Sequence, residues 1–295
     1  MQLSDMTKIV AMDILHDGEF DSLGLLSHSA DRMLVVLYDA DYLSQLNANP
    51  HISCVITSVD LARQLPKRLA VGVCDDPRSA FYNIHIFLFE KTGFYWKGFD
   101  SEISSQARVH EKAYVAPRNV RIGSGTIVES NATIMERAII CKNVVVRAGA
   151  VIAGTDLEAK YVNSKYVILP HAGGVLLEDG VEISNNAVIM RSVYGGFTVV
   201  GKDTKIGALV HVAHNARIGR RCFIGPCTIV CGSSKIGNNV WVGPNATISS
   251  ELSVGDGAKV TLGSVVVKDV PAGWRVSGNF AIEHSRFISF IKSIR

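Results

Sequence analysis

Residues 200–266 read VGKDTKIGALVHVAHNARIGRRCFIGPCTIVCGSSKIGNNVWVGPNATISSELSVGDGAKVTLGSVV and repeat with a period of six. Every sixth residue from Val200 to Val266 is Ile or Val, and the residue four places after each is small in nearly every hexad. The small positions are Thr204, Val210, Ala216, Cys222, Thr228, Ser234, Val240, Ala246, Leu252, Ala258 and Ser264. A fixed short period of this kind indicates a solenoid, in which successive turns of the chain stack on one another.

The two positions in each hexad predict a parallel β-helix of triangular cross-section. Each hexad would make one flat side and one corner, with the β-branched and the small residue pointing into a narrow prism. Three hexads would then make one coil. Glycine directly follows the aliphatic position in several hexads, where the backbone turns tightly. These glycines are Gly207, Gly219, Gly225, Gly237, Gly243 and Gly255.

An earlier block with the same rule runs from Ile122 to Ile152, so we expect the prism to begin near residue 105. Two segments interrupt the repeat, GTDLEAKYVNSKYVILPHAGG at 154–174 and MRSVYGGFT at 190–198. Insertions in a solenoid form surface loops, often on the binding face. The two segments are therefore predicted to form walls of a site.

The first hundred residues have a different character. Short apolar runs at 32–39, 52–58 and 69–75 predict buried strands, while 39–49 and 76–93 predict helices, the second with a proline in its first turn. This alternation indicates a small α/β domain. Its end holds eight of the 22 aromatic residues, which we expect mainly to pack in the core or between domains. They are Phe81, Tyr82, Phe87, Phe89, Phe94, Tyr95, Trp96 and Phe99.

At the other end of the chain, Phe280, Phe287, Ile291 and Ile294 have the spacing of a short amphipathic helix. The predicted division is therefore an α/β domain at 1–104, a β-helix at 105–278 and a short helix at 279–295. The fold class is mainly β.

Composition excludes several classes of function. The chain has 30 basic and 27 acidic residues, and the basic residues are dispersed, which argues against nucleic-acid binding. No apolar run approaches the roughly 18 residues of a membrane span, and the start lacks the features of a signal peptide. Six cysteines in a chain of 295 residues do not suggest a disulfide framework. These features predict a cytoplasmic protein.

The segment HVAHNARIGRRCFIG at 211–225 admits three readings: a metal site, a phosphate contact or a catalytic base. The spacing of Cys222, Cys227 and Cys231 follows no common zinc pattern, so we expect no metal there. Arg220 and Arg221 lie at a predicted corner, which favours a solvated turn over a phosphate clamp. His211 is predicted to point outward from a side, and His214 to lie at a corner with Asn215.

This part of the chain resembles a known family. The segments LPHAGGVLLEDGVEISNNAVIM, TKIGALVHVAHNARIG, CGSSKIGNNVWVGPNATI and VVKDVPAGWRVSGNFA are similar to the UDP-3-O-acylglucosamine N-acyltransferases of lipid A biosynthesis. The α/β domain resembles that family's uridine-binding domain more loosely, chiefly at DDPRSAF. Hexapeptide repeats by themselves indicate only the wider superfamily of hexapeptide-repeat acyltransferases.

The resemblance implies a left-handed β-helix and a homotrimer with active sites in the clefts between prisms. It implies that His214 is the general base for a sugar amine that attacks a thioester, with no metal and no tightly bound cofactor. It further suggests substrate contacts at His171, His211, Asn215 and Glu251. Contacts to the acyl donor are expected at Gly232, Gly263 and Lys268.

The chain departs from the family pattern near this base. Ile206-Gly207-Ala208 stands where the family has Ile-Asp-Asn, so a carboxylate expected near the base is missing. Glu251 stands where the family has a second histidine, and it is predicted either to orient His214 or to be a solvated corner residue. The chain also stops at Arg295, without the longer helical extension with which the lipid A enzymes engage acyl carrier protein.

The expected function is N-acyl transfer from a thioester to the amino group of a nucleotide-linked amino sugar, in lipid A or surface-polysaccharide biosynthesis. The donor is acetyl-CoA or acyl carrier protein, and the departures favour a short acyl chain and a sugar outside lipid A. The alternative is a non-catalytic β-helix that binds a sugar nucleotide or serves in assembly.

Overall fold

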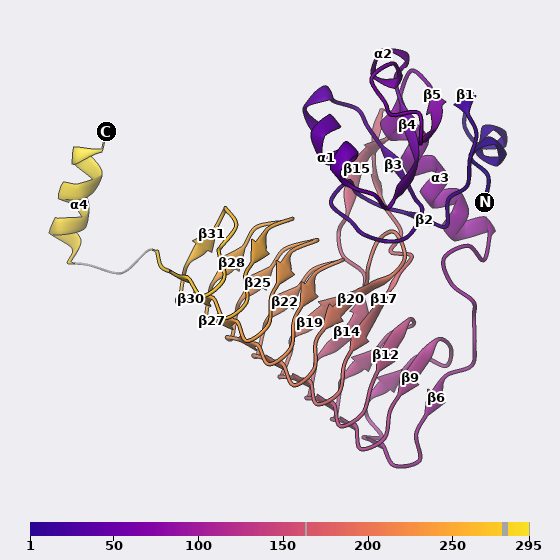
Figure 1. The fold of residues 1–295 in the computed structure, drawn as a ribbon. Helices are drawn as coiled ribbons and strands as arrows, with labels where there is room; N and C mark the ends of the chain where they lie inside the picture. Colours follow the sequence, from indigo (N-terminus) through magenta and orange to yellow (C-terminus); the bar gives the residue numbers. More distant parts are fainter. Residues whose placement is uncertain (163, 279–282, 295) are drawn as a thin grey trace.

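The computed structural model describes residues 1–162, 164–278 and 283–294. Figure 1 shows a long three-sided β-helix, a small domain that rests on its earlier coils, and a helix beyond its last coil. The predicted fold class is thus confirmed: stacked parallel sheets follow an N-terminal α/β domain and end with a C-terminal helix.

Three parallel sheets form the sides of the β-helix, and each coil contributes one strand to each sheet. Sheet A comprises β7 (Arg108–Val109), β10 (Ile127–Val128), β13 (Val145–Val146), β18 (Glu182–Ile183), β21 (Lys205–Ile206), β24 (Phe223–Ile224), β27 (Trp241–Val242), β30 (Lys259–Val260) and β32 (Arg275–Val276). Sheet B comprises β8 (Tyr114–Val115), β11 (Thr133–Ile134), β14 (Val151–Gly154), β19 (Val188–Met190), β22 (His211–Val212), β25 (Ile229–Val230), β28 (Thr247–Ile248) and β31 (Val265–Val266). Sheet C comprises β6 (Glu102–Ile103), β9 (Val120–Ile122), β12 (Ala138–Ile140), β17 (Gly174–Leu177), β20 (Phe197–Val200), β23 (Arg217–Ile218), β26 (Lys235–Ile236) and β29 (Ser253–Val254).

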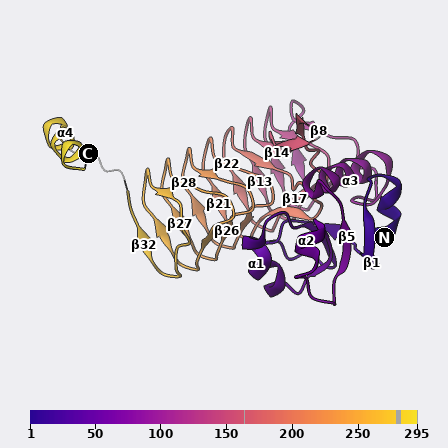
Figure 2. The same cartoon turned by 90° about the horizontal axis from the view of Figure 1, so that it is seen from above.

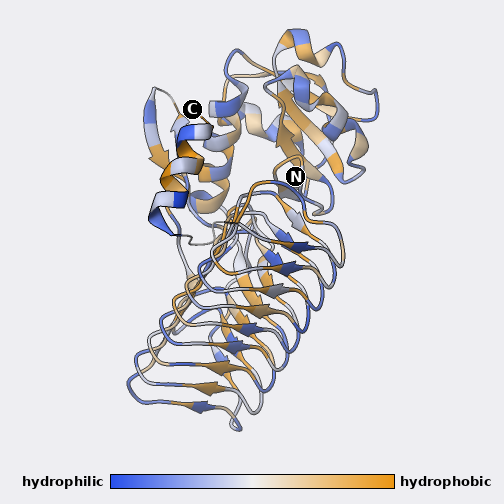
Figure 3. Cartoon of the chain, turned by 90° about the vertical axis from the view of Figure 1, so that its left-hand side faces the viewer, coloured by the Kyte–Doolittle hydropathy of each residue, from blue (hydrophilic) through white to orange (hydrophobic). Residues whose placement is uncertain are grey.

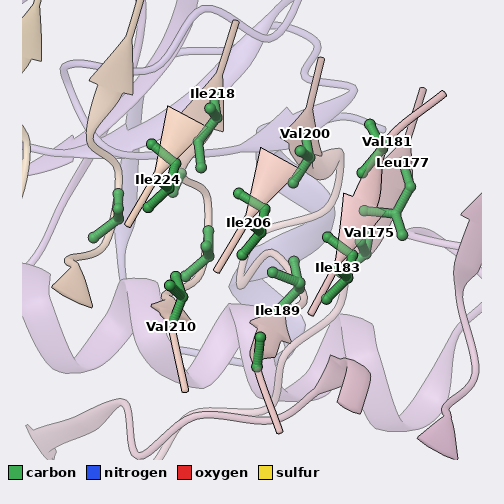
Figure 4. Close-up of a cluster of buried hydrophobic side chains, with 14 of the residues drawn as sticks. Val175, Leu177, Val181, Ile183, Ile189, Val200, Ile206, Val210, Ile218 and Ile224 are labelled. Atoms are coloured by element: carbon green, nitrogen blue, oxygen red, sulfur yellow. The ribbon is translucent and has the colours of Figure 1, made fainter. Parts of the chain in front are cut away.

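The interior of the β-helix is filled by the residues that the repeat predicts. All twelve aliphatic positions from Val200 to Val266 have exposed fractions of 6% or less, and Figure 4 shows several of them facing one another across the coils. Burying such a side chain contributes about 1.5–3 kcal/mol to stability. The inward hydroxyls are satisfied by the next coil: Thr204 Oγ1 donates to the carbonyl of Gly219 at 2.7 Å, and Thr228 Oγ1 to that of Gly243 at 3.1 Å. A side chain at Gly207 would have no space, because its Cβ would lie 2.6 Å from the nitrogen of Pro226.

The N-terminal domain is a five-stranded sheet in the order β1-β5-β4-β3-β2, with only β1 antiparallel to its neighbour. Its strands are β1 (Asp13–His16), β2 (Ser22–Leu23), β3 (Met33–Val36), β4 (Ile52–Thr57) and β5 (Ala70–Val73). Its α-helices are α1 (Leu43–Ala48), α2 (Val59–Ala62) and α3 (Pro77–Lys91), and its 3₁₀ helices are η1 (Leu3–Lys8) and η2 (Ala40–Tyr42). The three predicted strands and two predicted helices are confirmed. Helix α3 begins as expected, with Pro77 in its first turn and the Asp76 carboxylate accepting from the Ser79 N–H at 3.0 Å.

Both interruptions of the repeat are surface insertions that hold the N-terminal domain. The first contains an antiparallel hairpin of β15 (Ala159–Val162) and β16 (Lys165–Ile168), which packs against α3. Val162 and Leu169 from this insertion, with Tyr194 from the second, share one hydrophobic core with the N-terminal domain. The ring of Tyr194 lies 5.5 Å from that of Phe81. The expectation that the aromatic residues mainly pack at this junction is confirmed for those in this core.

The last helix, α4 (His284–Ser293), contains both hydrophilic and hydrophobic residues, as the colouring of its ribbon in Figure 3 shows. Phe287, Phe290 and Ile294 are exposed, while Phe280 lies outside the described residues. Within the described part of the chain, no helix combines the length and the apolar character that crossing a membrane requires.

Candidate active site

A cleft of about 1010 Å³, including the part open to solvent, separates the N-terminal domain from the β-helix. Figure 2 shows the domain lying along one side of the coils. The first insertion supplies Glu158 and Lys160 to the cleft wall, and the β-helix supplies His214. The remaining lining residues are Gly24, Leu25, Leu26, Val36, Tyr38, Tyr42, Gln45, Arg78, Phe81, Tyr82, Gly232, Ser233, Ser250 and Glu251.

His214 occupies the corner between β22 and β23, as predicted. The next residue, Asn215, has a positive φ of 62°, a conformation that Asn tolerates better than most residues. Its side-chain oxygen accepts from the Val193 N–H at 3.0 Å and lies 3.3 Å from Nδ1 of His214. Because the Val193 N–H fixes the orientation of this amide, Nδ1 of His214 is the nitrogen that donates, and Nε2 is left to accept a proton.

Glu158 faces that second nitrogen, with its Oε2 3.3 Å from Nε2 of His214. Burial disfavours a charged His214, but the hydrogen bond and charge of Glu158 outweigh burial, so the pKa of His214 lies above its ordinary value of 6.5. Burial also disfavours the charged form of Glu158, which by itself would raise the pKa of this carboxyl, but His214 and Lys160 lower the pKa to about 2. Lys160 Nζ lies 2.7 Å from the other oxygen of Glu158. The site thus holds an ionised carboxylate beside a histidine.

The family's aspartate is absent from 206–208, but a carboxylate from another part of the chain, Glu158, stands beside His214. The first insertion folds back over the corner between β22 and β23, and it supplies the Glu158 carboxylate there. The same insertion also supplies Asp156 to a second carboxylate–histidine pair, in which Asp156 Oδ2 lies 3.5 Å from Nε2 of His211. The contribution of this insertion was predictable in part, because the break in the repeat at 154–174 predicts a surface loop that forms a wall of the site.

Glu251 lines the cleft but is not the partner of His214. Its Oε2 accepts from the hydroxyl of Ser27 in the N-terminal domain at 2.9 Å, so it ties the two domains together. His171 is only 2% exposed, and its ring lies 5.7 Å from that of His214. Burial, and then the charge on His214, lower the pKa of His171 to about 4, so its ring is neutral.

The three glycine and lysine positions predicted for the acyl donor fall at different places. Gly232 packs against His214: a Cβ there would lie 2.5 Å from Cε1 of its ring. Its own N–H finds no acceptor among the described residues. Gly263 and Lys268 flank β31, three strands along sheet B from β22, and the structure does not bring them to the cleft.

Sequence reasoning missed the residues that the N-terminal domain contributes. Tyr38 and Tyr42 form an aromatic pair with ring centres 5.6 Å apart, and the Arg78 guanidinium lies 4.8 Å from the centre of the Tyr38 ring. All three line the cleft. Only Arg78 carried a signal, because it lies in the DDPRSAF motif.

The remaining features of the 211–225 segment have structural roles. Cys222 is buried inside the prism, and Cys227 is exposed. Arg220 and Arg221 are exposed at a corner, where Arg221 Nε donates to Asn239 Oδ1 at 2.8 Å.

Comparison with known proteins gives a family match on the β-helix. The family described as bacterial transferase hexapeptide (six repeats) matches residues 119–154 and 197–232. The UDP-3-O-acylglucosamine N-acyltransferase of Caulobacter vibrioides is 37% identical over 107 residues, which cover 36% of this chain and 29% of that protein. The enzyme of that name from Helicobacter pylori strain HPAG1 is 25% identical over 252 residues, covering 76% of this chain and 72% of that protein.

Among solved structures, the UDP-N-acetylglucosamine acyltransferase from Campylobacter jejuni matches with a TM-score of 0.51 at 18% identity, over 66% of this chain and 81% of that one. This likeness shows a shared fold. The match to the three Caulobacter relatives spans 29–40% of their length. The chain thus carries hexapeptide repeats of this transferase family, and it is similar to relatives named UDP-3-O-acylglucosamine N-acyltransferase at 25–44% identity.

Proposed function

We propose that this protein transfers an acyl group from a thioester to the amino group of a nucleotide-linked amino sugar. One observation carries the proposal: a histidine in an interdomain cleft has one ring nitrogen fixed by Asn215 and the other beside the Glu158 carboxylate. The names of the relatives support an N-acyl transfer to a UDP-linked glucosamine derivative of lipid A biosynthesis.

The proposed reaction needs one proton acceptor and one oxyanion stabiliser. The sugar amine attacks the thioester carbonyl, and Nε2 of His214 takes the proton that the nitrogen loses. Glu158 stabilises the imidazolium that results. The free N–H of Gly232, beside the base, is the candidate donor to the oxyanion of the tetrahedral intermediate. The thiolate then leaves with the proton, the amide remains on the sugar, and the histidine is neutral again.

The N-terminal wall of the cleft is the proposed acceptor site. Tyr38 offers an aromatic face for a nucleobase. Arg78, which lies over that ring, offers a charge for a phosphate oxygen. Lys160 is engaged by Glu158 and is therefore assigned to the base and not to the nucleotide.

The acyl donor is proposed as acetyl-CoA or acyl carrier protein, with a preference for a short chain. The pathway is proposed as lipid A or another surface glycan. We also propose a homotrimer, as the resemblance implies, in which a neighbouring β-helix would complete the donor side. Light scattering tests this point, and a monomer in solution would contradict it.

The central experiment measures thiol release from acetyl-CoA and from acyl carrier protein thioesters, with UDP- and dTDP-linked amino sugars as acceptors. We expect His214→Asn to lower kcat by several orders of magnitude while the fold is unchanged. His110→Asn, a change at an exposed histidine of the early coils, is the matched control. Absence of turnover in the wild-type protein with every pair, together with saturable binding of a nucleotide sugar, would instead support the non-catalytic binding protein.

A further inference from the structure

A second cavity lies on the other side of residues 24–30, the segment of the N-terminal domain that crosses the β-helix beside the cleft. Its volume is about 750 Å³, including the part open to solvent. His28 Nε2 lies 3.1 Å from the hydroxyl of Ser233, a residue that lines both spaces, so this contact separates them. The other lining residues used below are Asp21, Leu23, Phe94, Arg217 and Lys235.

Two cations on the outer face of sheet C give this cavity its charge. Arg217 in β23 and Lys235 in β26 are register partners on adjacent strands, which are spaced about 4.8 Å apart. Neither forms an ion pair with a described residue, although the Lys235 ammonium donates to the carbonyl of Ser27 at 3.2 Å. The carboxylate of Asp21, the one acidic residue lining the cavity, is already bound by Arg32 Nε at 2.6 Å.

The histidine beside these cations adds no charge. Burial, and then the charges of Lys235 and Arg217, lower the pKa of His28 to about 4, so its ring is neutral near neutral pH.

We propose that this cavity binds a phosphoryl group carried by a small organic ligand. Arginine and lysine are the usual partners of phosphate oxygens, and a phosphoryl group can accept from Arg217 and Lys235 on adjacent strands at once. The cavity is larger than phosphate alone, and Leu23 and Phe94 provide an apolar wall for the organic part. The inference does not depend on acyl transfer, because it rests on residues outside the cleft that holds His214.

Isothermal titration calorimetry of the full chain with inorganic pyrophosphate, at constant ionic strength in chloride, tests the proposal. We expect saturable binding that weakens by about tenfold or more in Arg217→Gln/Lys235→Gln, because charge-assisted hydrogen bonds are lost. The control Arg220→Gln/Lys259→Gln removes the same net charge from exposed positions outside the cavity and should stay within about twofold. Arg217→Gln alone removes one of the two cations, so it should weaken binding several-fold if the double variant does not fold.

Four results would overturn the proposal. The first is an absence of saturable binding to the wild-type protein. The second is equal weakening in the two double variants, which would indicate a general charge effect. The third is binding that is lost in Arg78→Gln but kept in Arg217→Gln/Lys235→Gln, since the pyrophosphate would then lie in the cleft. Citrate serves as a carboxylate probe, and binding of citrate as tight as that of pyrophosphate would contradict the phosphoryl assignment.

Discussion

Replacing Glu158 with glutamine should lower the pKa of His214. The change keeps the size of the side chain and removes its charge, 3.3 Å from the ring nitrogen that takes the proton. Lys160, which now pairs with Glu158 at 2.7 Å, would keep its positive charge beside the base. Both effects disfavour the imidazolium, so the pKa of His214 should fall.

The size of the shift follows from the separation and the burial of the two groups. Two unit charges at this distance attract by about 5 kcal/mol at an effective dielectric constant of about 20. Both side chains are mostly buried, with exposed fractions of 17% and 20%, and burial opposes the attraction by disfavouring both charges. A net loss of about 1.5–3 kcal/mol remains, which corresponds to a fall of about one to two pKa units.

The pKa can be measured without knowledge of the substrate. Carbon-detected or proton NMR titration of the histidine ring signals gives each pKa, and the spectrum of His214→Asn assigns the signal of the base. Once a substrate pair is known, the low-pH limb of kcat/KM should move to lower pH by the same amount. Its plateau should also fall, because the imidazolium formed during the reaction loses its counter-charge.

Two further variants sharpen this test. Glu251→Gln removes a carboxylate from the same cleft that bonds Ser27 and not the base, so it should leave the His214 titration nearly unchanged. Lys160→Met removes the opposing cation and should raise the pKa of His214. A Glu158→Gln midpoint equal to that of the wild type, or a shift no larger than that of Glu251→Gln, would refute the assigned pairing.

Three other predictions concern the base and the prism. Gly232→Ala should lower kcat by about 100-fold, because the added Cβ would displace the His214 ring. Gly263→Ala is the control: this residue has a φ of +64° and open space around it, so the change should cost about 1 kcal/mol of stability and leave the His214 ring in place. Equal kcat values in the two alanine variants would contradict the contact. The Glu158–His214 pair should contribute most to the free energy of unfolding between about pH 4.5 and 6.5. The contribution of His214 is lost as pH rises through its raised pKa, and the contribution of Glu158 is lost as pH falls from about 4.5 toward 2. Urea unfolding of wild type and Glu158→Gln at several pH values measures this difference, and a gap that grows above pH 8 would have the wrong sign. Ile224→Ala should lower the free energy of unfolding by about 2–5 kcal/mol at a fully buried position, whereas Lys259→Ala on an outer face should change it by less than about 0.5 kcal/mol.

The position of His214 followed from the repeat, and its proposed role as base from the resemblance. The hexad pattern placed His214 and Asn215 at a corner, and the structure has both there. By contrast, Glu251 was considered as the partner of His214 because it stands where the family has a histidine. The partner in the structure is Glu158, which reaches the corner only because its hairpin packs on α3 of the N-terminal domain.

Sequence periodicity by itself determined the β-helix, its inward residues and the surface position of its two insertions. It could do so because each coil repeats the same local pairing of an aliphatic and a small residue, and neighbouring coils bury these residues together. The tertiary structure alone decided which carboxylate meets His214, which aromatic residues line the cleft, and that Arg217 and Lys235 have no ion-pair partner among the described residues. Those contacts join segments far apart in the chain, and they depend on how the N-terminal domain packs against the insertions, which no local pattern encodes.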